Sequence, residues 1–179
     1  PKMKEWRYCW TFNIQIFFTD PEKQFVPNSF KVITSIEGLK KKIYQYTKDI
    51  LSALGENELL ADMIQIGNEI NCGMFFNNLN TDVGDPEHQV YFPPVLNDNF
   101  PECGVCGDDK NTDENWSRLR QVLKAGIKAV REIEEYFYYE IPIMLHIANP
   151  INANSFFSKL EEEEEEEEEY IDYDIIGLS

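Results

Sequence analysis

The residues best suited to chemistry lie in the stretch 63–71, where Met63 opens a strand-like run, Gly67 interrupts it, and Asn68 and Glu69 follow. Such a run is typical of a buried parallel strand that ends at the carboxyl-terminal edge of an α/β sheet or barrel, where these folds place their active sites. A glutamate at that edge, partly withdrawn from water, is suited to act as a general acid. A second interpretation stays open, in which Glu69 is a surface residue paired with a lysine or arginine.

Around this stretch, apolar patterns predict strands that alternate with helices, which indicates an α/β fold with parallel strands. Strands are expected at 8–18, 63–66, 141–147 and 173–178, and helices over 28–54, 113–137 and 149–159. The strand 141–147 is apolar apart from His146, and we expect it to be buried on both faces. A turn is expected at 19–24, where Asp20 precedes Pro21.

Helix ends are predicted from capping residues and glycines. Asn28 or Ser29 is expected to cap the first helix, because both residue types are good N-caps. Gly38 could divide that helix in two, and Gly55 is expected to end it. Asp113 is expected to cap the second helix, whose apolar positions recur over more than five turns.

Residues 62–74, which read Asp-Met-Ile-Gln-Ile-Gly-Asn-Glu-Ile-Asn-Cys-Gly-Met, resemble the acid/base strand of glycoside hydrolase family 53, the arabinogalactan endo-β-1,4-galactanases. Further segments follow in the family's order: 46–54 is similar to helix three, 123–132 to helix four, and 143–149 and 174–179 to strands five and six. The resemblance implies a partial TIM (β/α)8 barrel, about strands three to six. Residues 1–179 are therefore expected to form a single incomplete glycosidase catalytic domain, because a complete barrel has about 250 residues.

The resemblance also implies roles for individual residues. Glu69 corresponds to the acid/base of a retaining glycosidase, and Asn68 to the residue that binds the sugar 2-hydroxyl. His146 could bind a sugar hydroxyl or hold Glu69 in place, or it could be a satisfied core histidine. Phe76 stands where the family usually has a tryptophan, and Asn13 stands at a position that lines the sugar cleft. The nucleophile belongs at the end of strand seven, so no residue here is assigned that role.

The strand before the predicted turn departs from the family. Residues 20–24 match the family's Asp-Pro-x-Lys-Gln turn. In the strand itself, however, Asn13, Ile16 and Phe18 stand where the family has a histidine, an aspartate and a tryptophan. Two polar contacts to the sugar are therefore expected to be missing.

The long segment 73–113, rich in Asn, Asp, Gly and Pro, is expected to be a loop beside the cleft. Its residues 74–76 could stack on a sugar ring or pack onto the barrel rim. Cys103 and Cys106 form a Cys-x-x-Cys-Gly sequence that could supply half of a zinc site, completed by Cys9, Cys72, His88 or a carboxylate. A local disulfide or two free thiols are the other interpretations, and no metal or cofactor is assigned to the chemistry.

The composition limits the partners. Asp and Glu number 33 against 16 Lys and Arg, for a formal net charge of −17. This balance argues against a nucleic-acid partner, which would require clustered positive charge. The unbroken glutamate run 161–169 is expected to be a solvated helix extension or disordered. No apolar run approaches the ~20 residues of a membrane-spanning helix.

The function implied by the resemblance is hydrolysis of β-1,4-galactan or arabinogalactan by a secreted glycoside hydrolase. We expect no turnover from residues 1–179 alone, because one carboxylate cannot perform a double displacement. A half barrel would also expose sheet edges and apolar surface, so marginal stability and oligomerisation are expected. The alternative is a catalytically inactive protein that binds carbohydrate or another partner. A zinc-stabilised interaction module built on Cys103 and Cys106 ranks third.

Overall fold

The computed structural model describes residues 13–15, 19–20, 23–24, 29–30, 32–74, 103–105, 111–148, 150–162 and 170–179. Of the sequence-based expectations, those for Phe76, Cys9, His88 and Cys106 lie outside the described residues, as does 163–169 of the glutamate run. For the segments between 13 and 24, the backbone alone is described.

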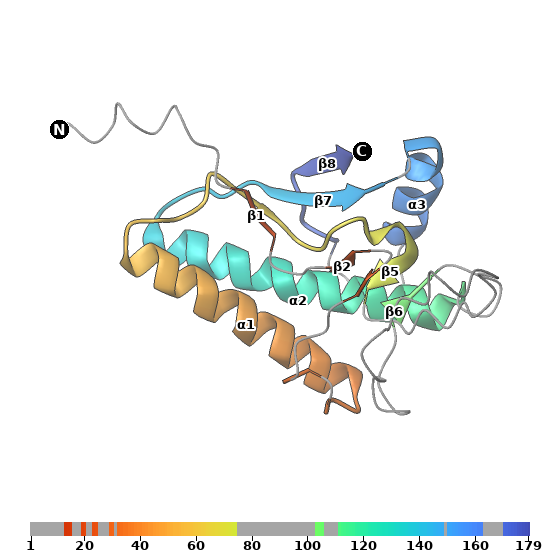
Figure 1. Ribbon diagram of the computed structural model, residues 1–179, viewed down its shortest axis with the longest axis horizontal. Coiled ribbons are helices and arrows are strands. Elements are labelled where there is room, and N and C mark those ends of the chain that lie inside the picture. Colours follow the sequence, from red (N-terminus) through yellow and green to blue (C-terminus); the bar gives the residue numbers. More distant parts are fainter. Residues whose placement is uncertain are drawn as a thin grey trace, which may run out of the picture.

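The described residues are organised around a four-stranded sheet in the order β1-β4-β7-β8, in which all neighbouring strands are parallel. Its strands are β1 (Asn13–Gln15), β4 (Met63–Gln65), β7 (Ile143–Ile147) and β8 (Ile175–Leu178). Parallel neighbours require crossover connections, and the helices α1 (Ile36–Glu56) and α2 (Asp113–Phe137) lie in the first two of them. Figure 1 shows both helices side by side against one face of the sheet. Strands and helices therefore alternate as predicted.

The remaining elements are short. The predicted turn at 19–24 is a hairpin of β2 (Thr19–Asp20) and β3 (Lys23–Gln24). The long segment after β4 opens with a 3-10 turn, η1 (Ile70–Cys72), and its base is a pairing of β5 (Gly73–Met74) with β6 (Cys103–Gly104). Beyond β7 lie η3 (Pro150–Asn152) and α3 (Ala153–Leu160). None of the helices in the described ranges combines the length and apolar character needed to cross a membrane.

The prediction for the ends of α1 was wrong at both termini. The helix begins after Ser35, whose hydroxyl accepts the Gly38 N–H at 3.2 Å, and not after residue 28 or 29. Gly38 lies in the first turn and does not divide the helix. Gly55 does not end it either, because the helix continues to Glu56. A β-carbon at Gly55 would lie 2.4 Å from the Phe137 ring. This glycine is required for close packing of α1 against α2.

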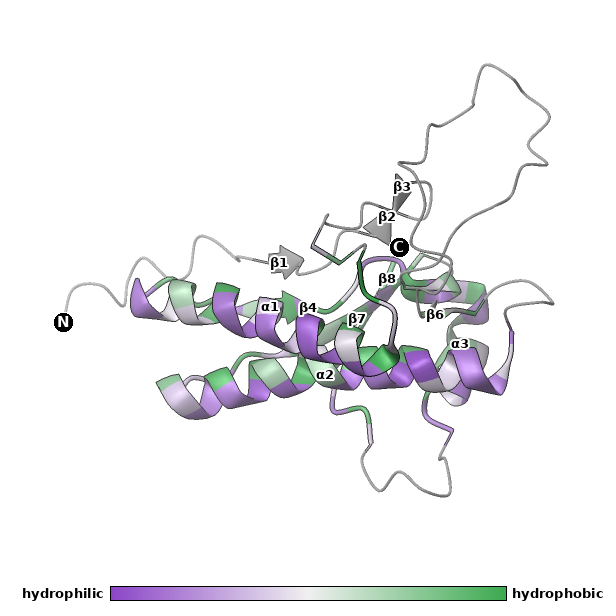
Figure 2. Ribbon diagram, turned by 90° about the horizontal axis from the view of Figure 1, so that it is seen from below, coloured by the Kyte–Doolittle hydropathy of each residue, from purple (hydrophilic) through white to green (hydrophobic). Residues whose placement is uncertain are grey.

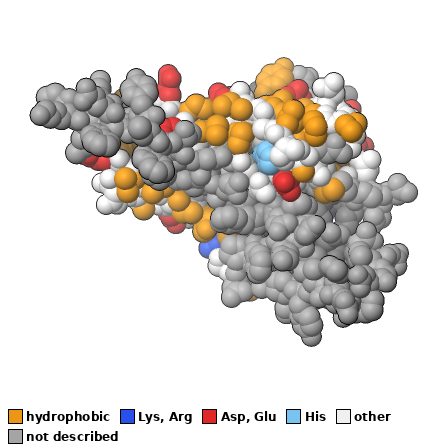
Figure 3. All heavy atoms as spheres, turned by 45° about the horizontal axis from the view of Figure 1, so that its top comes forward, with side chains coloured by type: hydrophobic (Ala, Val, Ile, Leu, Met, Phe, Trp, Pro, Cys, Tyr) orange, Lys and Arg blue, Asp and Glu red, His pale blue; other side chains and the backbone are white. Residues whose placement is uncertain are grey.

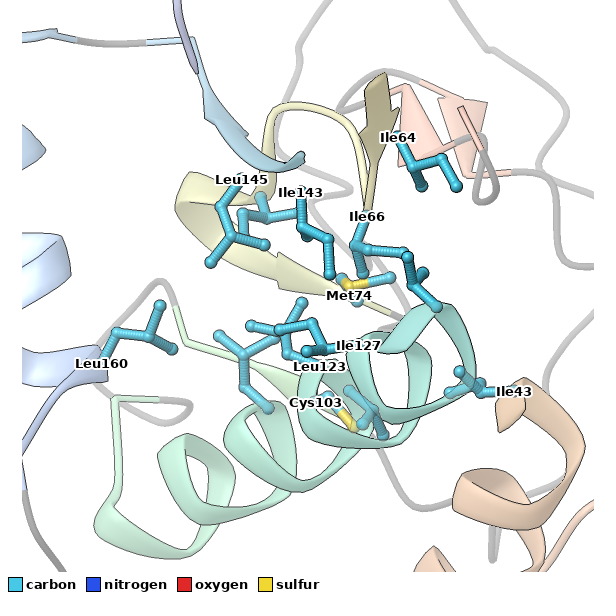
Figure 4. Close-up of a cluster of buried hydrophobic side chains, with 14 of the residues drawn as sticks. Ile43, Ile64, Ile66, Met74, Cys103, Leu123, Ile127, Ile143, Leu145 and Leu160 are labelled. Carbon is cyan, nitrogen blue, oxygen red and sulfur yellow. The ribbon is translucent and has the colours of Figure 1, made fainter. Parts of the chain in front are cut away.

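The core includes the buried faces of the sheet, α2 and α1, and Figure 4 shows part of it. Most of the predicted apolar stripe of α2 is buried: Trp116, Leu119, Leu123, Ile127, Val130 and Ile133. The cap of this helix is Thr112, whose hydroxyl accepts the Asn115 N–H, so Asp113 is the first helical residue and not the predicted cap. In Figure 2, seen from below, polar and apolar residues interleave along both long helices, which agrees with one buried face on each.

The expectation that strand 141–147 is buried on both faces was wrong. Along β7, Ile143, Leu145 and Ile147 are fully buried, whereas Met144 and His146 between them are only partly buried. The alternation gives the sheet an apolar face toward α2 and an opposite face that carries Met144 and His146. We call the latter the open face.

The last strand leaves apolar surface exposed. Ile175, Ile176 and Leu178 of β8 are 38%, 44% and 52% exposed. Exposed apolar side chains at a sheet edge agree with the expectation that part of a barrel leaves surface that a complete barrel covers. The expected oligomerisation stays a prediction.

Candidate active site

The predicted acid/base residue lies in a strained turn directly after β4. Gly67 has a φ of 75°, and Glu69 adopts the left-handed conformation with φ 49° and ψ 50°. A non-glycine residue in that region costs about 1–3 kcal/mol and persists only where its surroundings hold it. Glu58 and Tyr138 also have positive φ, so this conformation alone does not mark a functional site, and the acid/base role of Glu69 stays a prediction.

His146 of β7 contacts both residues of the Asn-Glu pair. The Glu69 backbone N–H donates to His146 Nδ1 at 3.3 Å, and the same nitrogen lies 3.2 Å from Asn68 Oδ1. All three side chains are partly buried. Figure 3 shows a histidine side chain, in pale blue, at the surface of this face, with apolar and acidic side chains near it. The structure therefore brings together Asn68, Glu69 and His146, three of the predicted site residues.

Two further polar residues hold this turn, and sequence analysis missed both. Gln65 is 2% exposed, and its Nε2 donates to Gly67 O at 2.7 Å and to Asn68 Oδ1 at 3.0 Å. Asn71 Oδ1 accepts the Ala148 N–H at 3.2 Å, which ties the residues after Glu69 to the end of β7. The sequence does single out Gln65, because it is the one polar residue in the apolar run 63–66.

The alternative interpretation of Glu69 was a surface carboxylate paired with a basic residue. Within the described part of the chain, Glu69 makes no salt bridge to a lysine or arginine. Glu69 is partly buried, and its backbone N–H contacts His146. The described residues therefore offer Glu69 no basic partner, and its acid/base role stays a prediction.

The other predicted cleft residues are less well defined. The sheet register pairs Asn13 with Met63 at the start of β4, whereas Glu69 follows the end of that strand. A role for Asn13 in sugar binding stays a prediction, as does one for Phe76. Met74 was one of the residues expected to pack onto the rim or to stack on a sugar. It is 1% exposed and belongs to the core cluster, so the packing interpretation holds for it.

The cysteines give limited support to a zinc site. Cys103 is buried and forms no disulfide, whereas Cys72 is disulfide-bonded. A cysteine in a disulfide has no thiolate to give a metal, so Cys72 is excluded as a fourth ligand. Across the described ranges, no three His, Cys, Asp or Glu side chains are grouped closely enough to hold a metal ion.

Comparison with protein families decides the relationship. The sequence profile described as glycosyl hydrolase family 53 matches residues 11–179. The chain belongs to this family. It is 32% identical to the arabinogalactan endo-beta-1,4-galactanase of Cellvibrio japonicus over 168 residues, which cover 94% of this chain and 36% of that protein. It is 26% identical to the endo-beta-1,4-galactanase of Bacillus subtilis, over 94% of this chain and 29% of that protein.

Solved structures of the family share the fold. The Ignisphaera aggregans GH53 catalytic domain superposes with a TM-score of 0.59 at 23% identity, over 98% of this chain and 39% of that one. A structure from a study of two fungal beta-1,4-galactanases superposes with a TM-score of 0.61 at 18% identity, over 93% of this chain and 40% of that one. The predicted fold class, a partial TIM (β/α)8 barrel, is therefore confirmed. The chain spans between 29% and 40% of the length of these four proteins.

Proposed function

We propose that this chain is part of a retaining endo-β-1,4-galactanase that hydrolyses internal bonds of β-1,4-galactan or arabinogalactan. The observation that carries the proposal is the turn 67–69, which presents Asn68 and Glu69 at the carboxyl end of β4 with His146 hydrogen-bonded to it. Galactan is too large to enter a cell intact, so secretion is part of the proposal. The names of the family 53 relatives agree with this substrate.

In this mechanism Glu69 protonates the oxygen of the leaving sugar, and a second carboxylate about 5–5.5 Å away attacks the anomeric carbon. Glu69 then acts as a base and activates the water that releases the product. Asn68 holds the sugar 2-hydroxyl through a hydrogen bond that strengthens toward the transition state, and His146 keeps the Glu69 backbone in place. The attacking carboxylate belongs to the seventh strand of a complete barrel, so residues 1–179 alone are expected to bind galactan without hydrolysing it.

The test needs a complete barrel. Residues 11–179 would replace the matched segment of the Cellvibrio japonicus relative, and reducing-sugar release from β-1,4-galactan would be measured for the resulting protein and its Glu69→Gln variant. Loss of general acid catalysis is expected to lower the rate by about 10²- to 10⁴-fold. Glu135→Gln, the same substitution at an exposed position of α2, is the matched control and should keep full activity.

The inactive, carbohydrate-binding alternative predicts a different result. In that case the complete barrel would bind galactan in a pull-down assay but release no reducing sugar, and Glu69→Gln would change nothing. Equal rates for Glu69→Gln and Glu135→Gln would exclude Glu69 as the acid/base.

A further inference from the structure

Gln65 is a buried polar residue at the end of β4, with a relative exposure of 2%. It points away from the helices, because its neighbours Ile64 and Ile66 occupy the helix side of the strand. A buried carboxamide is costly unless its hydrogen-bonding groups are satisfied. Both contacts of its Nε2, to Gly67 O and Asn68 Oδ1, lie in the turn that carries Glu69.

These contacts fix the direction of two carboxamides. Gly67 O is a backbone carbonyl and can only accept, so the Gln65 atom 2.7 Å from it must be the NH2 group. The second N–H of that group points at Asn68, which must therefore present its oxygen at 3.0 Å. A flipped Asn68 would face Gln65 donor to donor. The Asn68 carboxamide is thereby held with Oδ1 toward β4 and Nδ2 on the other side.

The orientation of the Asn68 carboxamide also determines which hydrogen-bonding groups surround His146 Nδ1. Its Nδ1 lies between Asn68 Oδ1, which can only accept, and the Glu69 N–H, which can only donate. An unprotonated Nδ1 binds the Glu69 N–H, whereas an Nδ1–H group binds Asn68 instead. If Asn68 were free to flip, its Nδ2 could donate to Nδ1 and remove this competition. Gln65 therefore influences the hydrogen bonding of His146 without contacting it.

We propose that Gln65 is a positioning residue, which orients the Asn68 carboxamide so that Nδ2 is offered as a donor to a hydroxyl oxygen of the bound sugar. The hydrogen bond from Asn68 to a sugar rests on the proposed function, whereas the orientation of the Asn68 carboxamide by Gln65 does not. Gln65 itself would not touch the sugar. Its role is to remove one of the two orientations of Asn68 before the ligand arrives, which lowers the cost of binding.

The binding test uses the 179-residue chain and β-1,4-galactotetraose in isothermal titration calorimetry. Gln65→Met keeps the volume but removes the donors, and it should weaken binding by about fivefold, the effect of one net hydrogen bond. Gln121→Met, the same substitution on α2, is the control and should not weaken binding. In an Asn68→Ala background, Gln65→Met should have no further effect, because Gln65 acts through Asn68. Independent, additive losses would overturn the proposal.

A second measurement needs no ligand. The imidazole nitrogen signals of His146, followed by nuclear magnetic resonance, should shift in Gln65→Met and stay unchanged in Gln121→Met. Unchanged His146 signals in Gln65→Met would overturn the assignment. If Gln65→Met does not fold, the wild-type Gln65 carboxamide protons provide the test: they should exchange slowly with water, and fast exchange would contradict the proposal. Shifted signals without any galactotetraose binding would overturn the proposed function while supporting the orientation of Asn68 by Gln65.

Discussion

Replacing Gly67 by alanine perturbs the turn at the point where β4 delivers the Asn-Glu pair. The φ of Gly67 is +75°, a conformation that L-residues with a side chain rarely adopt. An added β-carbon would also lie 2.4 Å from Ile70 Cγ2 and 3.3 Å from Met74 Sδ. Ile70 is fully buried and Met74 is 1% exposed, so neither side chain can move into solvent to make room.

Three contributions set the magnitude. The left-handed backbone costs an alanine about 1–2 kcal/mol. Inserting a methyl group into a packed core costs about 1–3 kcal/mol. The reduced entropy of the unfolded chain returns about 0.4–1 kcal/mol. The free energy of unfolding of Gly67→Ala should therefore fall by about 1–4.5 kcal/mol, with a central value of about 3 kcal/mol, and the melting temperature by about 2–4 °C for each kcal/mol.

Urea unfolding followed by circular dichroism measures this difference, and Gly126→Ala is the matched control. A β-carbon at Gly126 would lie 3.4 Å from Ile66 Cγ2, an ordinary contact, and this glycine lies within α2. Alanine is the better helix former by about 0.8–1 kcal/mol, so Gly126→Ala should be as stable as the wild type or more so. Equal stabilities of Gly67→Ala and Gly126→Ala would refute the account of the turn.

Two further predictions concern α2 and the sheet. Tyr138 caps α2 with a φ of 52°, and its side chain is 95% exposed, so Tyr138→Gly should raise the free energy of unfolding by about 1 kcal/mol, measured against Tyr138→Ala, which keeps the strain. Burial raises the pKa of Asp174, but hydrogen bonds from the Ile143 N–H and from Arg131 lower this pKa by a larger amount. The net pKa of Asp174 is therefore below its usual 3.8. Because the folded-state pKa is depressed, this stabilisation is present above about pH 4 and is lost as the pH falls through the folded-state pKa. Urea unfolding of Asp174→Asn should therefore show a smaller loss of stability below pH 4 than wild type, and an unchanged pH dependence would contradict this.

Much of the fold could be predicted because its signals are local. The stripe of α2 repeats at helical spacing, and all six of its members from Trp116 to Ile133 are buried. The ends of α1 could not be predicted in the same way. Gly55 looks like a helix terminator in the sequence, yet it is needed because the Phe137 ring of α2 packs on that position. The sequence around a glycine does not show whether a neighbouring helix or the local backbone conformation requires it.

The burial of β7 shows a second limit. From sequence, 141–147 looks like a strand covered on both faces, but Met144 and His146 are only partly buried in the structure. Both side chains lie on the open face, where a β-carbon at Gly177 of β8 would meet Met144 and His146. In a complete barrel this face is the interior. An apolar run therefore predicts a strand but does not show how completely each of its faces is covered.

The candidate site depends on register, which no single segment encodes. Gln65 pairs with Met144, so the residues two positions further along each strand, Gly67 and His146, reach the same level of the sheet on the same face. Because side chains alternate, a slip of one residue between β4 and β7 would turn His146 toward α2 and separate it from the Glu69 backbone. The buried Ile143 and Leu145 oppose that slip, since it would expose both. The apolar face of β7 therefore fixes the position of the histidine on its other face, and the core determines the geometry of the site.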